Sequence, residues 1–213
     1  NEDNTHYLDS PDYNNTVPTD ETFDGVIEGH HYSSDPNGTT TTLTYSFAGP
    51  GSQYDSASYS GRNWPNDGLT RLSDADIQLF EAQLQFVSNI TNLEFQRVED
   101  GGTAAGTIRP VWFKGTSETF SGYAEAPYPS KAAAGDIWFS QKILTDGSHN
   151  EFGRILIHEL GHALGLKHPH EPRPGFPVLD TEWLGREYTI MSYKVSVRHG
   201  EMTQDDIHPQ TFM

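Results

Sequence analysis

The sequence contains no cysteine, few basic residues and no long apolar run, and each of these absences excludes a class of protein. Without cysteine there are no disulfides and no thiolate metal ligands, so a transition-metal site would have to use histidine and carboxylate. The sequence has 13 lysines and arginines but 30 aspartates and glutamates, which gives a formal net charge of −17 at pH 7. Phosphate backbones and anionic lipids would be repelled, so we expect no nucleic-acid and no membrane partner. No segment approaches the ~18 consecutive apolar residues that span a bilayer.

The residues that are present are those of a folded, acidic protein. Hydrophobic residues make up 34% and aromatic residues 12% of the 213 positions. This composition predicts one large domain, or two lobes that share a cleft. We interpret the acidity as a solubility feature, with carboxylate-bound structural Ca²⁺ as the alternative, although no loop has the spacing of an EF-hand. Residues 1–22 lack the layout of a signal peptide, so either the signal was removed or export uses another route.

Apolar periodicity predicts a strand and an amphipathic helix in the first half of the chain. Residues 1–40 are rich in Asn, Asp, Thr and Ser, and we expect a mostly irregular segment there. Residues 43–47 alternate between apolar and polar, which is typical of a strand. Ser73 can cap a helix. The apolar face of that helix comprises Ile77, Phe80, Leu84 and Val87.

Further strands and a second helix follow. Strands are expected at residues 93–98, 107–113, 122–126 and 136–140. Pro110 predicts an edge strand or a bulge, whereas the apolar residues 136–140 predict an internal strand. Asn150 can cap the second helix, and Gly165 can end it in the left-handed conformation. The apolar positions of this helix are Phe152, Ile155, Leu156 and Leu160.

The segment from His158 to His168 reads H-E-x-x-H-x-x-G-x-x-H, a spacing that can bring three imidazoles to one point. His158 and His162 lie one turn apart on the same face of a helix. Glu159 lies about 100° round the helix from His158, beside the metal, which suits a base better than a ligand. Gly165 permits the turn that lets His168 reach the same ion.

Three neutral histidines leave a tetrahedral zinc ion with one open position, which is the pattern of catalytic sites. We therefore predict a zinc-dependent endopeptidase that hydrolyses internal peptide bonds with a zinc-activated water. The predicted ligands are His158, His162 and His168, and Glu159 is the general base that passes the proton to the departing amine. A closed structural zinc site would need a fourth protein ligand, and a recognition module has no need of a base. A zinc hydrolase that acts on a non-peptide amide stays open as an alternative.

Met191 and Tyr193 extend the motif. They lie in the stretch Y-T-I-M-S-Y, about twenty residues after His168. An extended zinc motif followed by a turn that contains methionine is the pattern of metzincins. The chain resembles serralysin-type metzincins, which have a tyrosine two residues after this methionine. The resemblance implies that Met191 forms the apolar floor of the zinc site and that Tyr193 is a removable fifth metal ligand, which hydrogen-bonds the transition-state oxyanion.

The resemblance spans about residues 40–210 and includes the sequences A-G-D-I-W-F at 134–139 and L-K-H-P at 166–169. It implies a metzincin-like α+β fold, with a twisted five-stranded mixed sheet, long helices and an active-site cleft between an upper and a lower lobe. After the irregular segment 1–40, we expect the catalytic domain at 41–213.

The upper lobe of this domain should end at about residue 165, and the lower lobe should comprise 166–213. Serralysins usually carry downstream Gly-Gly-x-Gly-x-Asp repeats that bind calcium, and none occurs here. We expect a catalytic fragment, a cleaved product or an incomplete sequence that lacks a C-terminal helix. His170 stands where the family often has glycine, and we expect it to be a surface residue.

An edge strand binds extended substrate in this family. The matching segment here comprises Ser121, Gly122, Tyr123, Ala124, Glu125 and Ala126. Main-chain pairing to such an edge predicts protein or peptide substrates of many sequences. A proteinaceous inhibitor is the other class of partner to consider, and a monomer is expected. Because an extracellular protein without disulfides is more often bacterial than animal, we expect a secreted bacterial protein.

Overall fold

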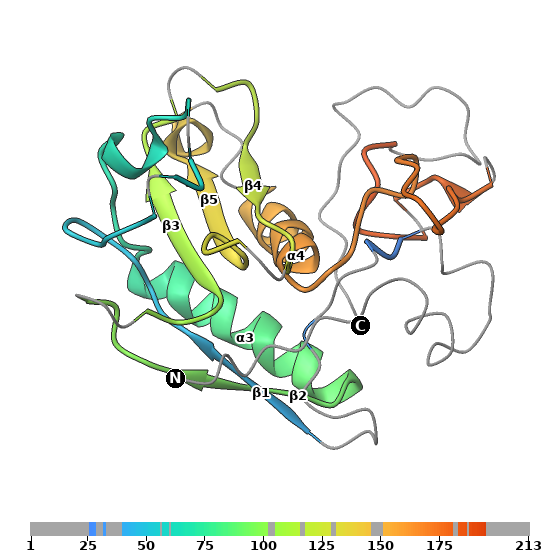
Figure 1. Ribbon diagram of the computed structural model, residues 1–213, viewed down its shortest axis with the longest axis horizontal. Coiled ribbons are helices and arrows are strands. Elements are labelled where there is room, and N and C mark those ends of the chain that lie inside the picture. Colours follow the sequence, from blue (N-terminus) through green and yellow to red (C-terminus); the bar gives the residue numbers. More distant parts are fainter. Residues whose placement is uncertain are drawn as a thin grey trace.

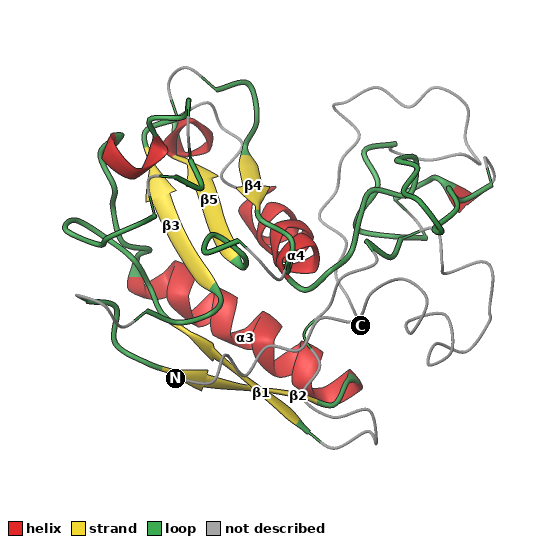
Figure 2. Ribbon diagram, in the orientation of Figure 1, coloured by secondary structure: helices red, strands yellow, loops and turns green. Residues whose placement is uncertain are grey.

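A computed structural model describes most of the region in which helices and strands are predicted. The described residues are 26–28, 32, 40–55, 57–59, 61–101, 105–115, 118–128, 131–145, 151–180, 183–186 and 188–194. Within these ranges the chain forms strands, two α-helices and the short 3₁₀ helices η1 (Trp64–Asn66) and η2 (Gln141–Leu144) (Figures 1 and 2). None of these helices is long and apolar enough to cross a membrane.

The strands form two small sheets. β1 (Thr41–Tyr45) pairs in parallel with β2 (Leu93–Arg97). β3 (Arg109–Phe113) is parallel to β5 (Asp136–Ser140), and β5 carries the antiparallel strand β4 (Gly122–Ala124) on its other side. The predictions of an internal strand at β5 and an edge strand at β4 are confirmed.

In the described part of the chain, one isolated β-bridge joins the two sheets. Tyr45 and Ile108 form an isolated parallel bridge, and the Ser46 amide donates to the Ile108 carbonyl at 3.1 Å. Because β1 ends at Tyr45 and β3 begins at Arg109, the two strands overlap too little for a continuous ladder. The α+β content is confirmed, whereas a single five-stranded sheet is not. Pro110 lies on an outer strand of the three-stranded sheet, as predicted.

Both α-helices begin and end near their sequence signals. α3 (Asp74–Ile90) starts after Ser73, whose hydroxyl accepts a hydrogen bond from a first-turn amide at 3.2 Å. α4 (Phe152–Ala163) is followed by Gly165, whose φ of 103° lies in the left-handed region. The predicted cap Asn150 lies outside the described residues. With 17 and 12 residues, the two helices do not confirm the expectation of long helices.

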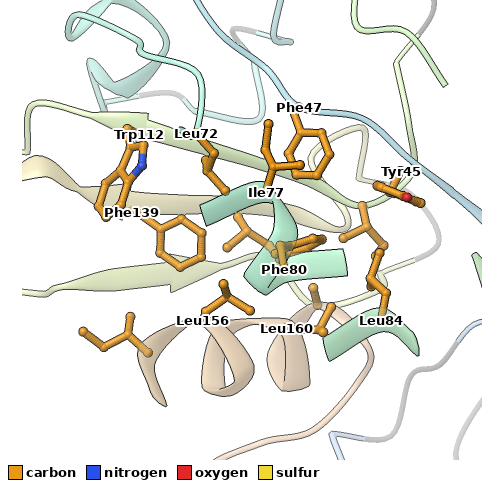
Figure 3. Packing of buried hydrophobic residues seen from close by; sticks show 14 of the residues in the cluster. Tyr45, Phe47, Leu72, Ile77, Phe80, Leu84, Trp112, Phe139, Leu156 and Leu160 are labelled. Carbon is orange, nitrogen blue, oxygen red and sulfur yellow. The ribbon is translucent and has the colours of Figure 1, made fainter. Parts of the chain in front are cut away.

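The helices pack on the sheets through one apolar cluster (Figure 3). Its buried helical side chains include Ile77, Phe80, Leu84, Leu156 and Leu160. Trp112 and Phe139 join this cluster from β3 and β5, whereas the alternate residues Val111 and Trp138 join an aromatic cluster on the opposite face. Because both faces are covered, β3 and β5 are buried along their whole length. β4, which pairs with the buried strand β5, contacts α4.

A short N-terminal segment lies against the chain that follows α4. Ile27 and Leu166 form an antiparallel bridge, and the Glu28 amide donates to the Gly165 carbonyl at 2.8 Å. Beyond Leu166, the described part of the chain contains no further helix or strand, so it consists of loops and turns.

Candidate metal centre

The end of α4 and the turn after it bring the three predicted histidines together. His158 and His162 lie one helical turn apart, and the turn at Gly165 reverses the chain so that His168 faces them. Nε2 of His168 lies 3.1 Å from Nε2 of His158 and 3.0 Å from Nε2 of His162. The local spacing in the sequence therefore produces a convergent set of imidazoles.

The outer nitrogen of each imidazole faces a hydrogen-bond acceptor. Nδ1 of His158 lies 2.8 Å from the Ile190 carbonyl, and Nδ1 of His162 lies 2.7 Å from the Leu166 carbonyl. Nδ1 of His168 lies 2.8 Å from Oε1 of Glu171. An acceptor at this position requires that Nδ1 carries the hydrogen, which leaves Nε2 with its lone pair. Three lone pairs thus point into one small space.

This donor set fits a metal ion. Lone pairs that face one another repel unless a cation lies between them. A tetrahedral zinc ion with Zn–N distances of about 2.0–2.1 Å would set its ligand nitrogens roughly 3.3 Å apart, close to the two separations here. Burial, and then repulsion by the neighbouring imidazole, lowers the pKa of His158 to about 3 and that of His162 to about 4. Both rings are therefore neutral at pH 7, as metal ligands must be.

Glu159 lies on α4 beside the imidazoles and is only 6% exposed. Burial raises the pKa of its carboxyl to about 8, and the charge of Arg154 opposes that rise. A divalent cation among the imidazoles would favour the carboxylate further. The side chain also lies close to β4, because a methyl group at Gly122 would be 2.7 Å from its Cγ. Glycine at this position lets the strand approach the carboxyl group.

Met191 and Tyr193 both lie at this centre. Met191 is fully buried, and a methyl group at Gly161 would be 2.6 Å from its Sδ, so the thioether packs directly against α4. Tyr193 is 55% exposed, and its ring centroid lies 4.3 Å from that of His168 and 5.5 Å from that of His158. Partial burial of its side chain raises the pKa of Tyr193 to about 12, so the phenol keeps its proton at pH 7.

Two cavities flank Glu159 and Tyr193, and both of these residues line each cavity. Their volumes are about 300 and 250 Å³. The predicted substrate segment contributes to both: Ser121 lines the smaller cavity, Gly122 lines both, and the larger is lined by Tyr123, Ala124, Glu125 and Ala126. β4 stands at one end of the strand order, so its outer side carries no strand in the described part of the chain.

The larger cavity also contains residues that the sequence did not reveal: Glu28, Tyr128, Glu171 and Arg173. Arg173 Nε lies 3.0 and 3.1 Å from the two carboxylate oxygens of Glu28, and the Tyr128 hydroxyl donates to Glu28 at 2.6 Å. No local pattern marks Glu28, because it falls in a segment of irregular composition. Glu171 carried a usable signal, since it is a carboxylate three residues after the third histidine.

The chain is similar to several known proteins. The family model described as Matrixin (peptidase M10) matches residues 56–174, more than half of the chain. Serralysin G of Dickeya chrysanthemi is 29% identical over 172 residues, which cover 73% of this chain and 34% of that protein. A serralysin of Proteus mirabilis is 33% identical over 125 residues, which cover 50% of this chain and 26% of that protein. The solved structure of myroilysin matches 68% of this chain and 55% of its own at 22% identity, with a TM-score of 0.41. The chain thus spans about a third or less of the length of the curated relatives named here.

Proposed function

The chain belongs to the Matrixin family, and on that premise we propose that it is a zinc-dependent metalloendopeptidase, a serralysin-like metzincin that hydrolyses internal peptide bonds. The observation that carries this proposal is the convergence of three imidazole lone pairs beside a buried carboxyl group. A structural zinc site would need a fourth protein ligand in place of substrate, and here the neighbouring space is a cavity.

The metal ligands in this proposal are Nε2 of His158, His162 and His168. A zinc ion held there would supply Lewis acidity, which would acidify a water molecule and polarise the scissile carbonyl. Glu159 acts as the general base: it accepts the proton of the attacking water and returns it to the departing amine. The burial of Glu159 supports this role, because a base in a site of low polarity loses and gains its proton near neutral pH.

Tyr193 and Met191 complete the centre. We assign Tyr193 as a removable ligand whose protonated phenol donates a hydrogen bond to the developing oxyanion. Its exposed position against His158 and His168 supports a side chain that can move away from the metal and back. We assign Met191 as the apolar floor, since its thioether packs against Gly161 of the helix that carries two ligands.

The substrates in this proposal are proteins or extended peptides. Among the described residues no strand pairs with the outer side of β4, which lies next to Glu159, so a peptide could add to the sheet as a further strand. The segment from Ser121 to Ala126 would form one wall of the cleft, and the loops after Gly165 would form the other. Main-chain pairing explains tolerance of sequence, while the two cavities would select side chains on either side of the cut.

The domain boundaries also remain proposals. We propose a catalytic domain that begins near residue 41, with an upper lobe to about residue 165 and a lower lobe from 166, and we propose that the protein is secreted from a bacterium as a monomer. Inhibition by a protein and structural Ca²⁺ are further proposals. The bacterial serralysins to which the chain is similar are much longer than it.

A mixed peptide library incubated with the protein, with and without a chelator, tests the activity. Mass spectrometry should detect internal cuts that disappear with the chelator and return with added zinc. The Glu159→Ala variant should retain one zinc ion per chain and lose nearly all cleavage. Glu94→Ala is the matched control, because it removes a carboxylate from an exposed position on β2.

Two outcomes would refute the proposal. Cleavage by Glu159→Ala at the wild-type rate would exclude the general-base role. A wild-type chain that binds zinc but cuts no peptide in the library would indicate a recognition module or a hydrolase of non-peptide amides instead.

A further inference from the structure

The third histidine differs from the other two in what holds its outer nitrogen. His158 and His162 donate to backbone carbonyls, whose positions are fixed by the polypeptide itself. His168 donates to the side chain of Glu171, at 2.8 Å. His168 lies beyond the end of α4, so the helix does not orient its ring. The carboxylate therefore has an orienting task that the backbone performs elsewhere in the site.

Glu171 is itself held in place. Its amide donates to the His168 carbonyl at 3.1 Å, which closes a turn between the two residues. Its Oε2 lies 3.6 Å from Nη2 of Arg173, and Arg173 is bound by the buried carboxylate of Glu28. Tyr128 donates to the same carboxylate at 2.6 Å. This series of contacts connects the third imidazole to the chain next to β4 and restricts a side chain that is 37% exposed.

A second metal ion is the competing explanation for the same side chains. His168, His170 and Glu171 have ligand atoms within 4.8 Å of one another. However, Nε2 of His168 faces the first site and its Nδ1 donates to Glu171, so neither nitrogen is free to bind another ion. His170 is exposed, as predicted, and its ring stacks on His168 with a centroid distance of 5.4 Å. Two remaining groups make a poor site.

We propose that Glu171 is a positioning residue for the zinc ligand His168, an inference that rests on the proposed zinc site. Its negative charge favours the Nδ1–H tautomer, fixes the ring plane and increases the basicity of Nε2 toward a cation. It also places a second carboxylate, besides Glu159, near the two positive charges that a zinc ion brings. Loss of such a carboxylate typically weakens metal binding by about 10–100-fold.

The test measures zinc affinity directly, by competition with a chromophoric chelator, in the full chain. We expect Glu171→Ala to raise the zinc dissociation constant about 10–100-fold and to accelerate zinc release. Glu171→Gln keeps a neutral acceptor for Nδ1, so its dissociation constant should fall between those of the wild type and Glu171→Ala. His168→Ala sets the upper limit of the loss, and Glu94→Ala controls for the change in net charge, with an expected difference below about twofold.

Melting curves of the metal-free proteins separate positioning from folding. Because Glu171 is partly exposed, its removal should shift the metal-free Tm by no more than about 2–4 °C. An unchanged zinc affinity in Glu171→Ala would overturn the inference, as would a much larger fall in Tm that accompanies zinc loss. Two zinc ions per wild-type chain, one of them lost in Glu171→Ala, would favour the second-metal explanation and would also overturn it.

These measurements need no substrate, so they are separable from the test of the activity. A chain whose zinc affinity depends on Glu171 but which cleaves no peptide would refute the proposed function alone. Intact cleavage together with unchanged zinc affinity in Glu171→Ala would refute the role of Glu171 alone.

Discussion

The close approach of β4 to Glu159 gives the most direct prediction, which concerns Gly122→Ala. A methyl group at Gly122 would lie 2.7 Å from Cγ and Oε1 of Glu159, whereas ordinary contacts of a Cβ atom begin at 3.4 Å. The carboxylate would have to withdraw by about 0.7 Å, and it is buried, so it cannot relax freely into solvent. Displacements of about 1 Å in a catalytic group can cost about 100-fold in rate. Gly122 has no positive φ, so alanine adds no backbone strain.

We expect Gly122→Ala to lower kcat about 100-fold on a fluorogenic peptide, with a smaller change in KM. Zinc content, measured by atomic emission, should stay at one ion per chain because Glu159 is not a ligand. Gly153→Ala on α4 is the matched control, since its methyl group would meet only Leu79 Cδ2, at 3.8 Å. A kcat within threefold of the wild type in Gly122→Ala would refute the assignment of Glu159 to a position against β4.

Three further predictions concern other parts of the site and the core. Tyr193→Phe should lower kcat by about 10–100-fold with little loss of zinc, and zinc loss as large as that of His162→Ala would contradict its oxyanion role. Gly161→Ala should push Met191 away from α4 and lower the free energy of unfolding by about 1–3 kcal/mol, which a thermal melt would detect as a lower Tm. An unchanged Tm would show that Met191 does not support the helix. Burial raises the pKa of Asp136 to about 7 in the folded protein, so its contribution to stability is complete below pH ~4 and is lost as the pH rises through 7. In urea unfolding, the free energy of unfolding of Asp136→Asn should therefore rise by up to about 4 kcal/mol relative to that of the wild type as the pH increases from 4 to 7. Free energies of unfolding that change with pH in the same way in both proteins would contradict this.

The local signals in the sequence were sufficient to predict the helices and the convergence of the three histidines. A cap at Ser73 and a left-handed glycine at Gly165 act on their immediate neighbours, so their effect does not depend on the rest of the fold. The same holds for His158 and His162, whose common direction follows from the pitch of one helix. His168 needed only the turn that Gly165 permits.

Long-range pairing could not be predicted in the same way. The bridge between Tyr45 and Ile108 depends on where two separate strands stop, and alternation of apolar residues does not specify that register. A resemblance to a family implied one continuous sheet, whereas the described strands form two. Glu28 reaches the site only because Ile27 pairs with Leu166, far along the chain, and nothing near Glu28 in the sequence indicates it.

That pairing has a practical consequence for any shortened version of the protein. A chain cut at the start of β1 would keep every residue of the zinc motif, yet the Gly165 carbonyl and the Lys167 amide would lose the backbone partners that Glu28 and Val26 provide. Unpaired backbone groups lower the stability of the fold, and here they lie next to the turn that positions His168. We expect removal of residues 26–28 to appear first as poor retention of zinc, so a functional unit would need this segment in addition to the domain proposed to begin near residue 41.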